Sequence, residues 1–290
     1  MIAGQQPLGT PRTILAGLVG SGIQRSRTPA MHEAEGAANG IRLVYRLFDT
    51  GEMGARPPPL AEILRSAEVC GFSGLNVTYP FKLEVMEHLD ELSENARAIG
   101  AVNTVVFAEG KRVGHNTDLW GFAESFRRAL PGVPRRRVLL VGAGGAGVAA
   151  AFAMMENGAE HLRIHDKDPA KAAAVADAVC RQKGPGAASL ANDLAEASRD
   201  IDGLINATPV GMDKLPGTPF PLDLLCPSMW VADVIYFPLE TELLKAAQDR
   251  GCLVMGGAGM AVFQAVRAFE LFTGITPDPD RFSECFASLG

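Results

Sequence analysis

The stretch that decides the fold reads Val138-Leu139-Leu140-Val141-Gly142-Ala143-Gly144-Gly145-Ala146-Gly147. Its apolar start predicts a buried strand, and its glycines form a Gly-x-Gly-x-x-Gly turn before a helix. In that pattern the first glycine permits a tight turn, the second lets the backbone approach a pyrophosphate, and the third allows close helix–strand packing. Unpaired N–H groups at the helix N-terminus attract the anion. We therefore predict a dinucleotide site over Gly142, Ala143, Gly144, Gly145, Ala146 and Gly147.

The apolar run from Val138 to Met155 contains no charged residue and has the length of a membrane span. Its cluster of glycines favours a strand, a tight turn and a buried helix instead. We predict no membrane segment here.

An acidic residue supports the dinucleotide site. Asp166 stands about twenty residues beyond Gly147, at the end of the next predicted strand, where a carboxylate accepts hydrogen bonds from the adenosine ribose of NAD. Its charge would repel the 2′-phosphate of NADP, although Lys167 offers a cation that softens this preference. The alternative is that Asp168 before Pro169 caps a helix and Asp166 is only solvated. NAD is the predicted cofactor, with NADP second.

Strands and helices alternate on both sides of this stretch, which predicts an α/β fold with mostly parallel sheets. Upstream we expect strands at 14–20, 43–48 and 74–77, a hairpin at 102–107 and 111–114, and helices at 60–70 and 118–130. Thr28-Pro29 predicts a helix with Thr28 at the N-cap, closed by Asn39-Gly40. A further helix is expected from Pro80, with an apolar face of Phe81, Val85, Met86 and Leu89. Downstream we expect strands at 137–142, 161–166, 203–207 and 231–235, and helices at 145–157, 169–182, 257–273 and 278–288.

Composition excludes several classes of protein. The chain has 290 residues, 47% apolar and 21% charged, with a formal net charge of −6, which disfavours nucleic-acid binding. The five cysteines are scattered and odd in number, so they predict neither a disulfide framework nor a zinc site and fit a reducing cytosol. Residues 1–13 lack the apolar core of a signal peptide. We expect a cytoplasmic, metal-free protein.

Three polar signatures precede the glycine turn. They read Asn76-Val77-Thr78-Tyr79-Pro80-Phe81-Lys82, Ala101-Val102-Asn103-Thr104 and Asn116-Thr117-Asp118. Small hydrogen-bonding side chains, an amine and a carboxylate suit the recognition of a polyhydroxylated substrate and the movement of a proton. With the glycine turn they indicate alcohol oxidation by a nicotinamide cofactor.

This combination, in this order, resembles the shikimate dehydrogenase family, including its quinate/shikimate branch, from about residue 17 to about residue 264. The resemblance implies an N-terminal substrate domain, 1–117, completed by C-terminal helices at 258–290, and a Rossmann domain at 118–257. It implies that Ser26 and Thr28 bind the substrate carboxylate, with Thr28 in place of the family's second serine. It assigns the remaining substrate contacts to Asn76, Thr78, Asn103, Tyr236 and Gln264.

The resemblance also extends the cofactor site. Residues 206–212 resemble the family's Asn-Ala-Thr-x-x-Gly-Met loop, and Gly257 opens the late motif that contains Gln264. NADP-dependent members usually carry Asn-Arg-Thr where this chain has His165-Asp166-Lys167, and this departure favours NAD. The added cofactor residues are Asn206, Ala207, Thr208, Gly211, Met212 and Gly257.

Lys82 and Asp118 are the predicted catalytic pair. Taken singly, a lysine beside an apolar run is usually solvated and an aspartate opening a helix is usually a cap. Free lysine has a pKa near 10.4, and a neighbouring carboxylate would raise it further. Lys82 is therefore either the base or the group that stabilises the developing alkoxide while a Lys82–Asp118–water relay removes the proton.

The implied function is NAD-dependent hydride transfer between quinate or shikimate and the 3-dehydro ketone, by a monomer or homodimer acting on small molecules only. Three alternatives remain: NADP-dependent biosynthetic shikimate dehydrogenase, a non-catalytic sensor on the same fold, and a tetrahydrofolate-linked dehydrogenase. Asp166 argues against the first. The intact Lys82 and Asp118 argue against the second, and Gln264 with the Asn-Thr-Asp signature argues against the third.

Overall fold

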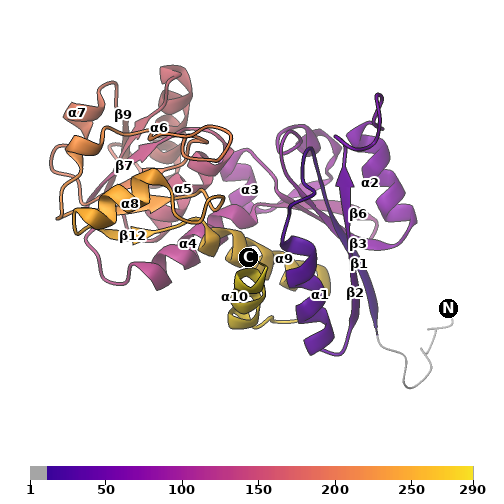
Figure 1. Cartoon of the computed structure of the whole chain (residues 1–290). Coiled ribbons are helices and arrows are strands. Elements are labelled where there is room, and N and C mark those ends of the chain that lie inside the picture. The colour runs from indigo at the N-terminus through magenta and orange to yellow at the C-terminus, as the bar shows by residue number, and fades with distance from the viewer. Residues whose placement is uncertain (1–11, 290) are drawn as a thin grey trace. The chain divides into compact units, whose positions relative to one another are not determined.

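The computed structural model describes residues 12–289, which form two compact units (Figure 1). Unit 1 comprises residues up to Ser93, then Val102–His115 and the segment from Ala265 onward. Unit 2 comprises Glu94–Ala101 and Asn116–Gln264. Each unit has its own six-stranded sheet packed by helices, so the predicted two-domain α/β fold is confirmed. The ends of the predicted substrate domain, residues 1–11 and 290, lie outside the described residues.

The sheet of unit 1 is mixed, in the order β2-β1-β3-β5-β6-β4. Strands β2 and β3 flank β1 in parallel, whereas β5 pairs antiparallel with β3 and forms a hairpin with β6. The elements of this unit are β1 Thr13–Gly20, α1 Thr28–Ala38, β2 Arg42–Asp49, α2 Leu60–Val69, β3 Phe72–Val77, η1 Glu84–His88, β4 Glu91–Leu92, β5 Thr104–Ala108, β6 Lys111–His115 and α10 Pro279–Ser288.

An aromatic cluster joins the C-terminal segment to the rest of unit 1. His32 of α1 lies with its ring centroid 4.7 Å from that of Tyr45 on β2 and 5.8 Å from that of Phe269 on α9, the helix Ala258–Thr273. Phe282 of α10 closes the cluster at 5.7 Å from His32. A salt bridge also connects the two segments: the carboxylate of Glu35 on α1 lies 2.6 Å from the guanidinium of Arg281 on α10. Residues more than 220 positions apart therefore share one core.

The sheet of unit 2 is entirely parallel, in the order β12-β11-β10-β7-β8-β9. Strand order reverses between β7 and β10, which is the switch point where doubly wound sheets bind ligands. The elements of this unit, besides the start of α9, are α3 Glu94–Ile99, α4 Thr117–Ala129, β7 Arg137–Val141, α5 Gly145–Glu156, β8 His161–His165, α6 Pro169–Lys183, β9 Ala188–Leu190, α7 Leu194–Ala197, β10 Gly203–Asn206, η2 Leu222–Leu224, β11 Trp230–Asp233, α8 Glu242–Asp249 and β12 Leu253–Met255.

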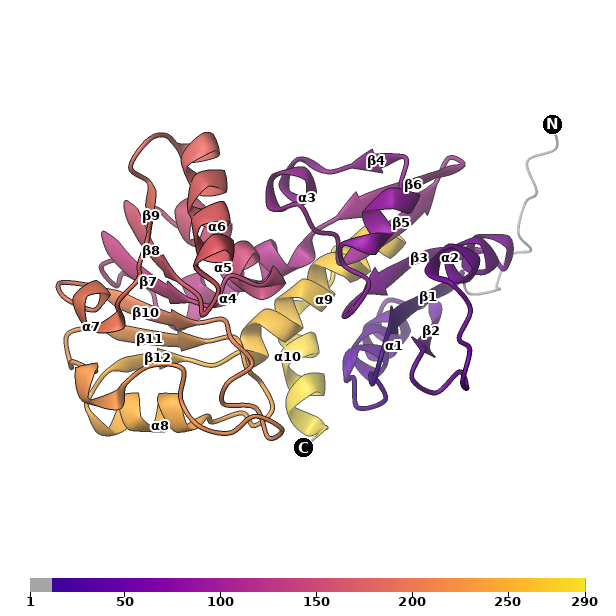
Figure 2. The ribbon, with the colours of Figure 1, turned by 90° about the horizontal axis from the view of Figure 1, so that it is seen from above.

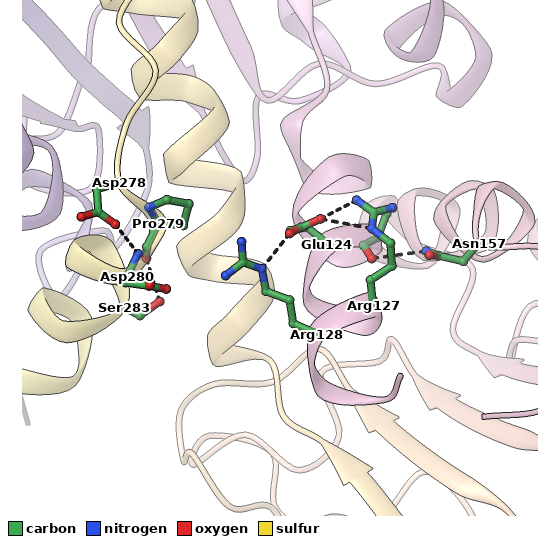
Figure 3. Close-up of polar contacts among 9 residues, drawn as sticks. Glu124, Arg127, Arg128, Asn157, Asp278, Pro279, Asp280 and Ser283 are labelled. Carbon is green, nitrogen blue, oxygen red and sulfur yellow. Dashed lines mark hydrogen bonds and ion pairs between the residues drawn. The ribbon is translucent and has the colours of Figure 1, made fainter. Parts of the chain in front are cut away.

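Helices cover both faces of the unit 2 sheet (Figure 2). Alternate residues of β7 point to opposite sides: Leu140 packs with α4, α5 and α6, and Leu139 packs with α7 and α8. Polar contacts support the α4 side, where Asn157 donates to the carbonyl of Ala123 at 3.3 Å and Glu124 binds Arg127 and Arg128 (Figure 3). The strands are held between two apolar layers, so their carboxyl ends are fixed in position.

Most predicted elements are present within a few residues of their expected bounds, but two predictions are wrong. The helix expected from Pro80 is a turn followed by the short 3₁₀ helix η1. The carbonyl of Lys82 accepts from the N–H of Val102 at 3.0 Å, so it is diverted from the α-helical bond to Met86, whose N–H bonds Leu83 instead. Thr28 is the first residue of α1 rather than its N-cap, which is Arg27, and no side chain caps this helix.

Short elements were not predicted at all. They include α3, β4, β9, α7, α8 and β12, most of them too brief to show a period. Within residues 12–289, no helix combines the length and the apolar character that a membrane crossing requires.

Candidate active site

The glycine turn has the geometry that its sequence predicts. Gly142 has φ +104°, and a Cβ there would lie 2.7 Å from the backbone carbon of Ala207, so the loops after β7 and β10 touch. A Cβ on Gly147 would lie 1.9 Å from the carbonyl oxygen of Gly142. A Cβ on Gly144 or Gly145 would meet nothing within 4 Å. Two glycines thus serve packing, and two leave open space beside the helix.

The N-terminus of α5 suits an anion. No side chain caps it, its first turn holds no acidic residue, and its N-cap, Gly144, is exposed. The N–H groups of a helix's first turn carry partial positive charge. Open space, absent side chains and oriented N–H groups are what a pyrophosphate needs, so the residues present fit a dinucleotide.

Asp166 immediately follows β8 and is tied to the glycine turn. Its carboxylate accepts from the N–H of Ala143 at 2.7 Å and from that of Asp168 at 2.9 Å. Partial burial raises the pKa of Asp166, but these hydrogen bonds, with the charges of Lys171 and Lys167, bring it below its ordinary value. Asp168 separately caps α6 through Ala170. The helix cap and the carboxylate at the turn are therefore different residues, and Asp166 remains an anion at neutral pH.

The loop after β10 is held by a buried polar network. Asn206 donates to Asp233 at 3.1 Å and accepts from the N–H and hydroxyl of Thr208 at 2.9 and 2.8 Å. Asp233 also accepts from Thr241 at 2.8 Å, and burial raises the pKa of Asp233. Through these hydrogen bonds Asn206 holds the start of the predicted cofactor loop, which runs from Ala207 and Thr208 to Gly211 and Met212.

Four further predicted residues belong to unit 2. Asp118 lies buried in the first turn of α4, but Asn116 is the cap, because its side chain accepts from Leu119 at 3.2 Å. The N-cap of α4 is therefore Asn116 and not Asp118. Gln264 is half-buried on α9, and Tyr236 is 38% exposed in the turn after β11. Gly257 immediately precedes α9, and a Cβ there would lie 2.2 Å from the carbonyl oxygen of Val234.

Unit 1 holds Lys82 and the other predicted substrate residues. Ser26 and Thr28 are brought together at the start of α1, where the Ser26 hydroxyl donates to Thr28 Oγ1 at 3.1 Å. The preceding loop is fixed by Asp49, whose carboxylate accepts from the N–H groups of Gly22 and Ile23 at 2.8 and 2.9 Å. Although burial raises the pKa of Asp49, these bonds and those from Gln24 and Gly51 lower it overall.

The remaining residues of this set lie on adjacent strands. Asn76 and Thr104 are paired across β3 and β5, and the Asn76 amide donates to Thr104 Oγ1 at 2.9 Å. Asn103 precedes β5, and its N–H bonds the carbonyl of His115 at 3.1 Å. Thr78 follows β3, with its N–H on the carbonyl of Val19. Lys82 is half-buried in the turn before η1.

Sequence reasoning missed Asp49, Tyr45 and Thr104, which contact predicted site residues or their loop. Asp49 was signalled only by its position at the end of a strand. Tyr45 lies inside a predicted strand and gives no separate signal, whereas Thr104 stands in one of the polar signatures but was given no role of its own. Among residues 12–289 no group of three or more His, Cys, Asp or Glu side chains is placed to hold a metal ion.

Two family models match the chain: the shikimate dehydrogenase substrate binding domain over residues 18–105 and the shikimate 5'-dehydrogenase C-terminal domain over residues 257–282. A Streptomyces avermitilis shikimate dehydrogenase (NADP(+)) is 49% identical over 97% of both chains. The chain belongs to the shikimate dehydrogenase family. Within this family, a Corynebacterium efficiens quinate/shikimate dehydrogenase (NAD(+)) is also 49% identical, over 96% of this chain and 99% of its own.

The family fold is shared with a solved structure, the quinate dehydrogenase from Corynebacterium glutamicum in complex with NAD. That structure covers 96% of this chain and 99% of its own, with 45% identity and a TM-score of 0.92. Because an NADP-named and an NAD-named relative are equally identical to this chain, overall identity does not decide the cofactor. The residues at the cofactor site must decide it.

Proposed function

We propose that this chain is an NAD-dependent dehydrogenase that interconverts quinate or shikimate with the corresponding 3-dehydro ketone. The observation that carries the proposal is Asp166, an anion hydrogen-bonded to the glycine turn at 2.7 Å, in a member of the shikimate dehydrogenase family. Relatives named for NAD and for both substrates, and the NAD complex of the quinate dehydrogenase, support it.

The cofactor would be held mainly by backbone. The N–H groups at the start of α5 would take the pyrophosphate, and the Asp166 carboxylate would accept from the ribose hydroxyls. Each carboxylate oxygen of Asp166 receives one backbone hydrogen bond and retains capacity for another. A 2′-phosphate at the same place would meet a negative charge. When bound, NAD would supply the hydride acceptor.

The substrate would be held mainly by side chains. We assign its carboxylate to the hydroxyls of Ser26 and Thr28, which lie 3.1 Å apart, and its ring hydroxyls to Asn76, Thr78 and Asn103 with Gln264 and Tyr236. Lys82 and Asp118 would handle the proton of the reacting hydroxyl. A lysine ammonium stabilises a developing alkoxide, and a buried carboxylate can pass the proton onward.

We assign the cofactor role to residues 118–257 and the substrate role to residues 1–117 with 258–290. We place the enzyme in the cytoplasm as a monomer or homodimer. The five cysteines are all free thiols, which fits a reducing compartment.

Initial rates with quinate and shikimate, each with NAD and NADP, test the proposal. We expect turnover of at least one substrate with a higher kcat/KM for NAD than for NADP. A higher kcat/KM for NADP would move the assignment to the biosynthetic shikimate dehydrogenase. Binding of shikimate without turnover with either cofactor would favour a sensor.

A further inference from the structure

Two predicted substrate residues of unit 1, Asn76 and Asn103, are linked by a buried chain of hydrogen bonds. The Tyr45 hydroxyl donates to Asn76 Oδ1 at 2.6 Å, and Asn76 Nδ2 donates to Thr104 Oγ1 at 2.9 Å. The Thr104 hydroxyl in turn donates to Asn103 Oδ1 at 3.1 Å. Every donor in this chain points the same way, from β2 through β3 to β5.

The direction of the chain follows from its chemistry. Burial holds the pKa of Tyr45 well above its ordinary value, so the phenol stays protonated and remains a donor. A threonine hydroxyl has one proton, which Thr104 gives to Asn103 while accepting from Asn76. If the Asn76 amide were reversed, Asn76 Oδ1 would face Thr104 and would need the hydroxyl proton of Thr104. Thr104 could then no longer donate that proton to Asn103 Oδ1.

This series of hydrogen-bonded side chains is also rigid. Tyr45 is 5% exposed, Asn76 3%, Asn103 3% and Thr104 0%. The Tyr45 ring is packed by His32, and Asn76 and Thr104 are opposite each other in the strand register. A buried polar network that is satisfied fixes one arrangement of its members, and breaking one link leaves a polar atom unsatisfied.

We propose that Tyr45 and Thr104 are positioning residues that set the amide orientation of Asn76 and Asn103 for the ring hydroxyls of the substrate. An amide offers a donor on one side and an acceptor on the other, so a reversed amide presents the wrong group to a hydroxyl pattern. The inference rests on the proposed function, which assigns both asparagines to the substrate.

The test compares Tyr45→Phe, Thr104→Val and Thr104→Ser with Asn76→Ala. Phenylalanine and valine keep the shape and remove the hydroxyl, and serine keeps the hydroxyl. Thr273→Val is the matched control, because Thr273 is also a buried threonine of unit 1, 3% exposed. Its hydroxyl donates a hydrogen bond to the carbonyl of Phe269 and accepts one from the N–H of Ile275. The readouts are KM and kcat for shikimate, quinate and NAD, calorimetric titration with shikimate, and the thermal midpoint.

We expect Tyr45→Phe and Thr104→Val to raise the KM and Kd of shikimate about tenfold, the effect of losing roughly one hydrogen bond, with kcat less affected. The KM of NAD should stay within about twofold, and Thr104→Ser should restore substrate binding. Thr273→Val should lower the thermal midpoint without changing the KM of shikimate.

Failure of this inference is distinguishable from failure of the proposed function. If Asn76→Ala weakens shikimate binding but Tyr45→Phe and Thr104→Val behave like Thr273→Val, the positioning role is overturned alone. If Asn76→Ala leaves shikimate binding unchanged, or if the wild-type protein neither binds nor turns over shikimate or quinate, the site assignment falls and the inference with it.

Discussion

The two units offer a ligand different kinds of surface. At the β7–β10 switch point of unit 2 the proposed contact groups are backbone N–H groups, and Gly144 and Gly145 have no side chain and face open space. Beside β3 and β5 of unit 1 the proposed contact groups are the amides of Asn76 and Asn103, which accept hydrogen bonds from the hydroxyls of Tyr45 and Thr104. A change in unit 2 should therefore act through sterics and a change in unit 1 through chemistry.

The largest expected effect comes from adding one methyl group in unit 2. Gly147→Ala would place a Cβ 1.9 Å from the carbonyl oxygen of Gly142, a backbone atom that can move only if the turn opens. We expect the free energy of unfolding to fall by about 3 kcal/mol and NAD binding to be lost, consistent with the cost of overpacking. Urea denaturation and NAD titration measure both.

Gly145→Ala is the control, because its Cβ would meet nothing within 4 Å and alanine favours the helix. Its free energy of unfolding should equal or exceed that of the wild type. Equal stability of the two variants would contradict the view that packing, rather than ligand access, requires the third glycine.

Removing the amine of Lys82 in unit 1 should leave the fold intact and slow hydride transfer strongly. Lys82→Ala is expected to lower kcat by roughly 10²-fold, the usual contribution of a positioned proton-transfer group. Lys111→Ala removes an exposed lysine of the same unit that pairs with Glu91 on the surface, and it should be silent. Near-normal turnover by folded Lys82→Ala would remove this lysine from the mechanism.

Among the proposed cofactor contacts of unit 2, that of Asp166 depends on a side-chain charge. Asp166→Asn should lower the ratio of kcat/KM for NAD to that for NADP by about tenfold, equivalent to roughly 1.4 kcal/mol. Asp168→Asn is matched, since it removes the same charge two residues away and asparagine still caps α6. If both variants shift the ratio equally, the effect is general electrostatics and Asp166 is not the ribose anchor.

The sequence was most informative where local rules apply. The strand, turn and helix around Gly142–Gly147 and the hairpin of β5 and β6 depend on nearby residues, and they were predicted within a few positions. The helix expected from Pro80 failed because a distant N–H, that of Val102, takes the carbonyl of Lys82. Pairing between segments remote in sequence leaves no periodic signal.

The same limit applies to the site. Lys82, Asp118 and the asparagines could be singled out because they lie in short polar motifs. Tyr45 and Asp49 could not, since both lie in β2, outside any such motif, and are singled out only by contacts such as that of Tyr45 with Asn76. The residues that we propose as ligand contacts lie in motifs, whereas the residues that hold these contacts in place are scattered along the sequence.

We also expect the two units to differ in their response to acid. His32 is the one fully buried histidine of the described residues. Its two ring nitrogens have no hydrogen-bond partner, and burial lowers its pKa from 6.5 to about 3. The groups packed against it are the phenyl rings of Phe269, Phe272 and Phe282 and the Tyr45 ring, which stays neutral in acid. No anion in this cluster compensates a protonated imidazole.

Because the folded pKa of His32 is below the unfolded one, its neutral form costs no stability above pH 6.5. Below pH 6.5 His32 binds a proton in the unfolded chain but not in the folded one. The free energy of unfolding therefore falls by roughly 1.4 kcal/mol per pH unit until about pH 3. His32→Phe removes this dependence while other titrating groups are unchanged. We expect the difference in unfolding free energy between the two proteins to grow by about 1 kcal/mol from pH 6.5 to 5.5, because the unfolded histidine is only half protonated at pH 6.5. Amide exchange should show β2 losing protection before β7 in the wild type only. A difference that does not change with pH would mean that His32 is accommodated as a cation and that unit 1 is no more acid-sensitive than unit 2.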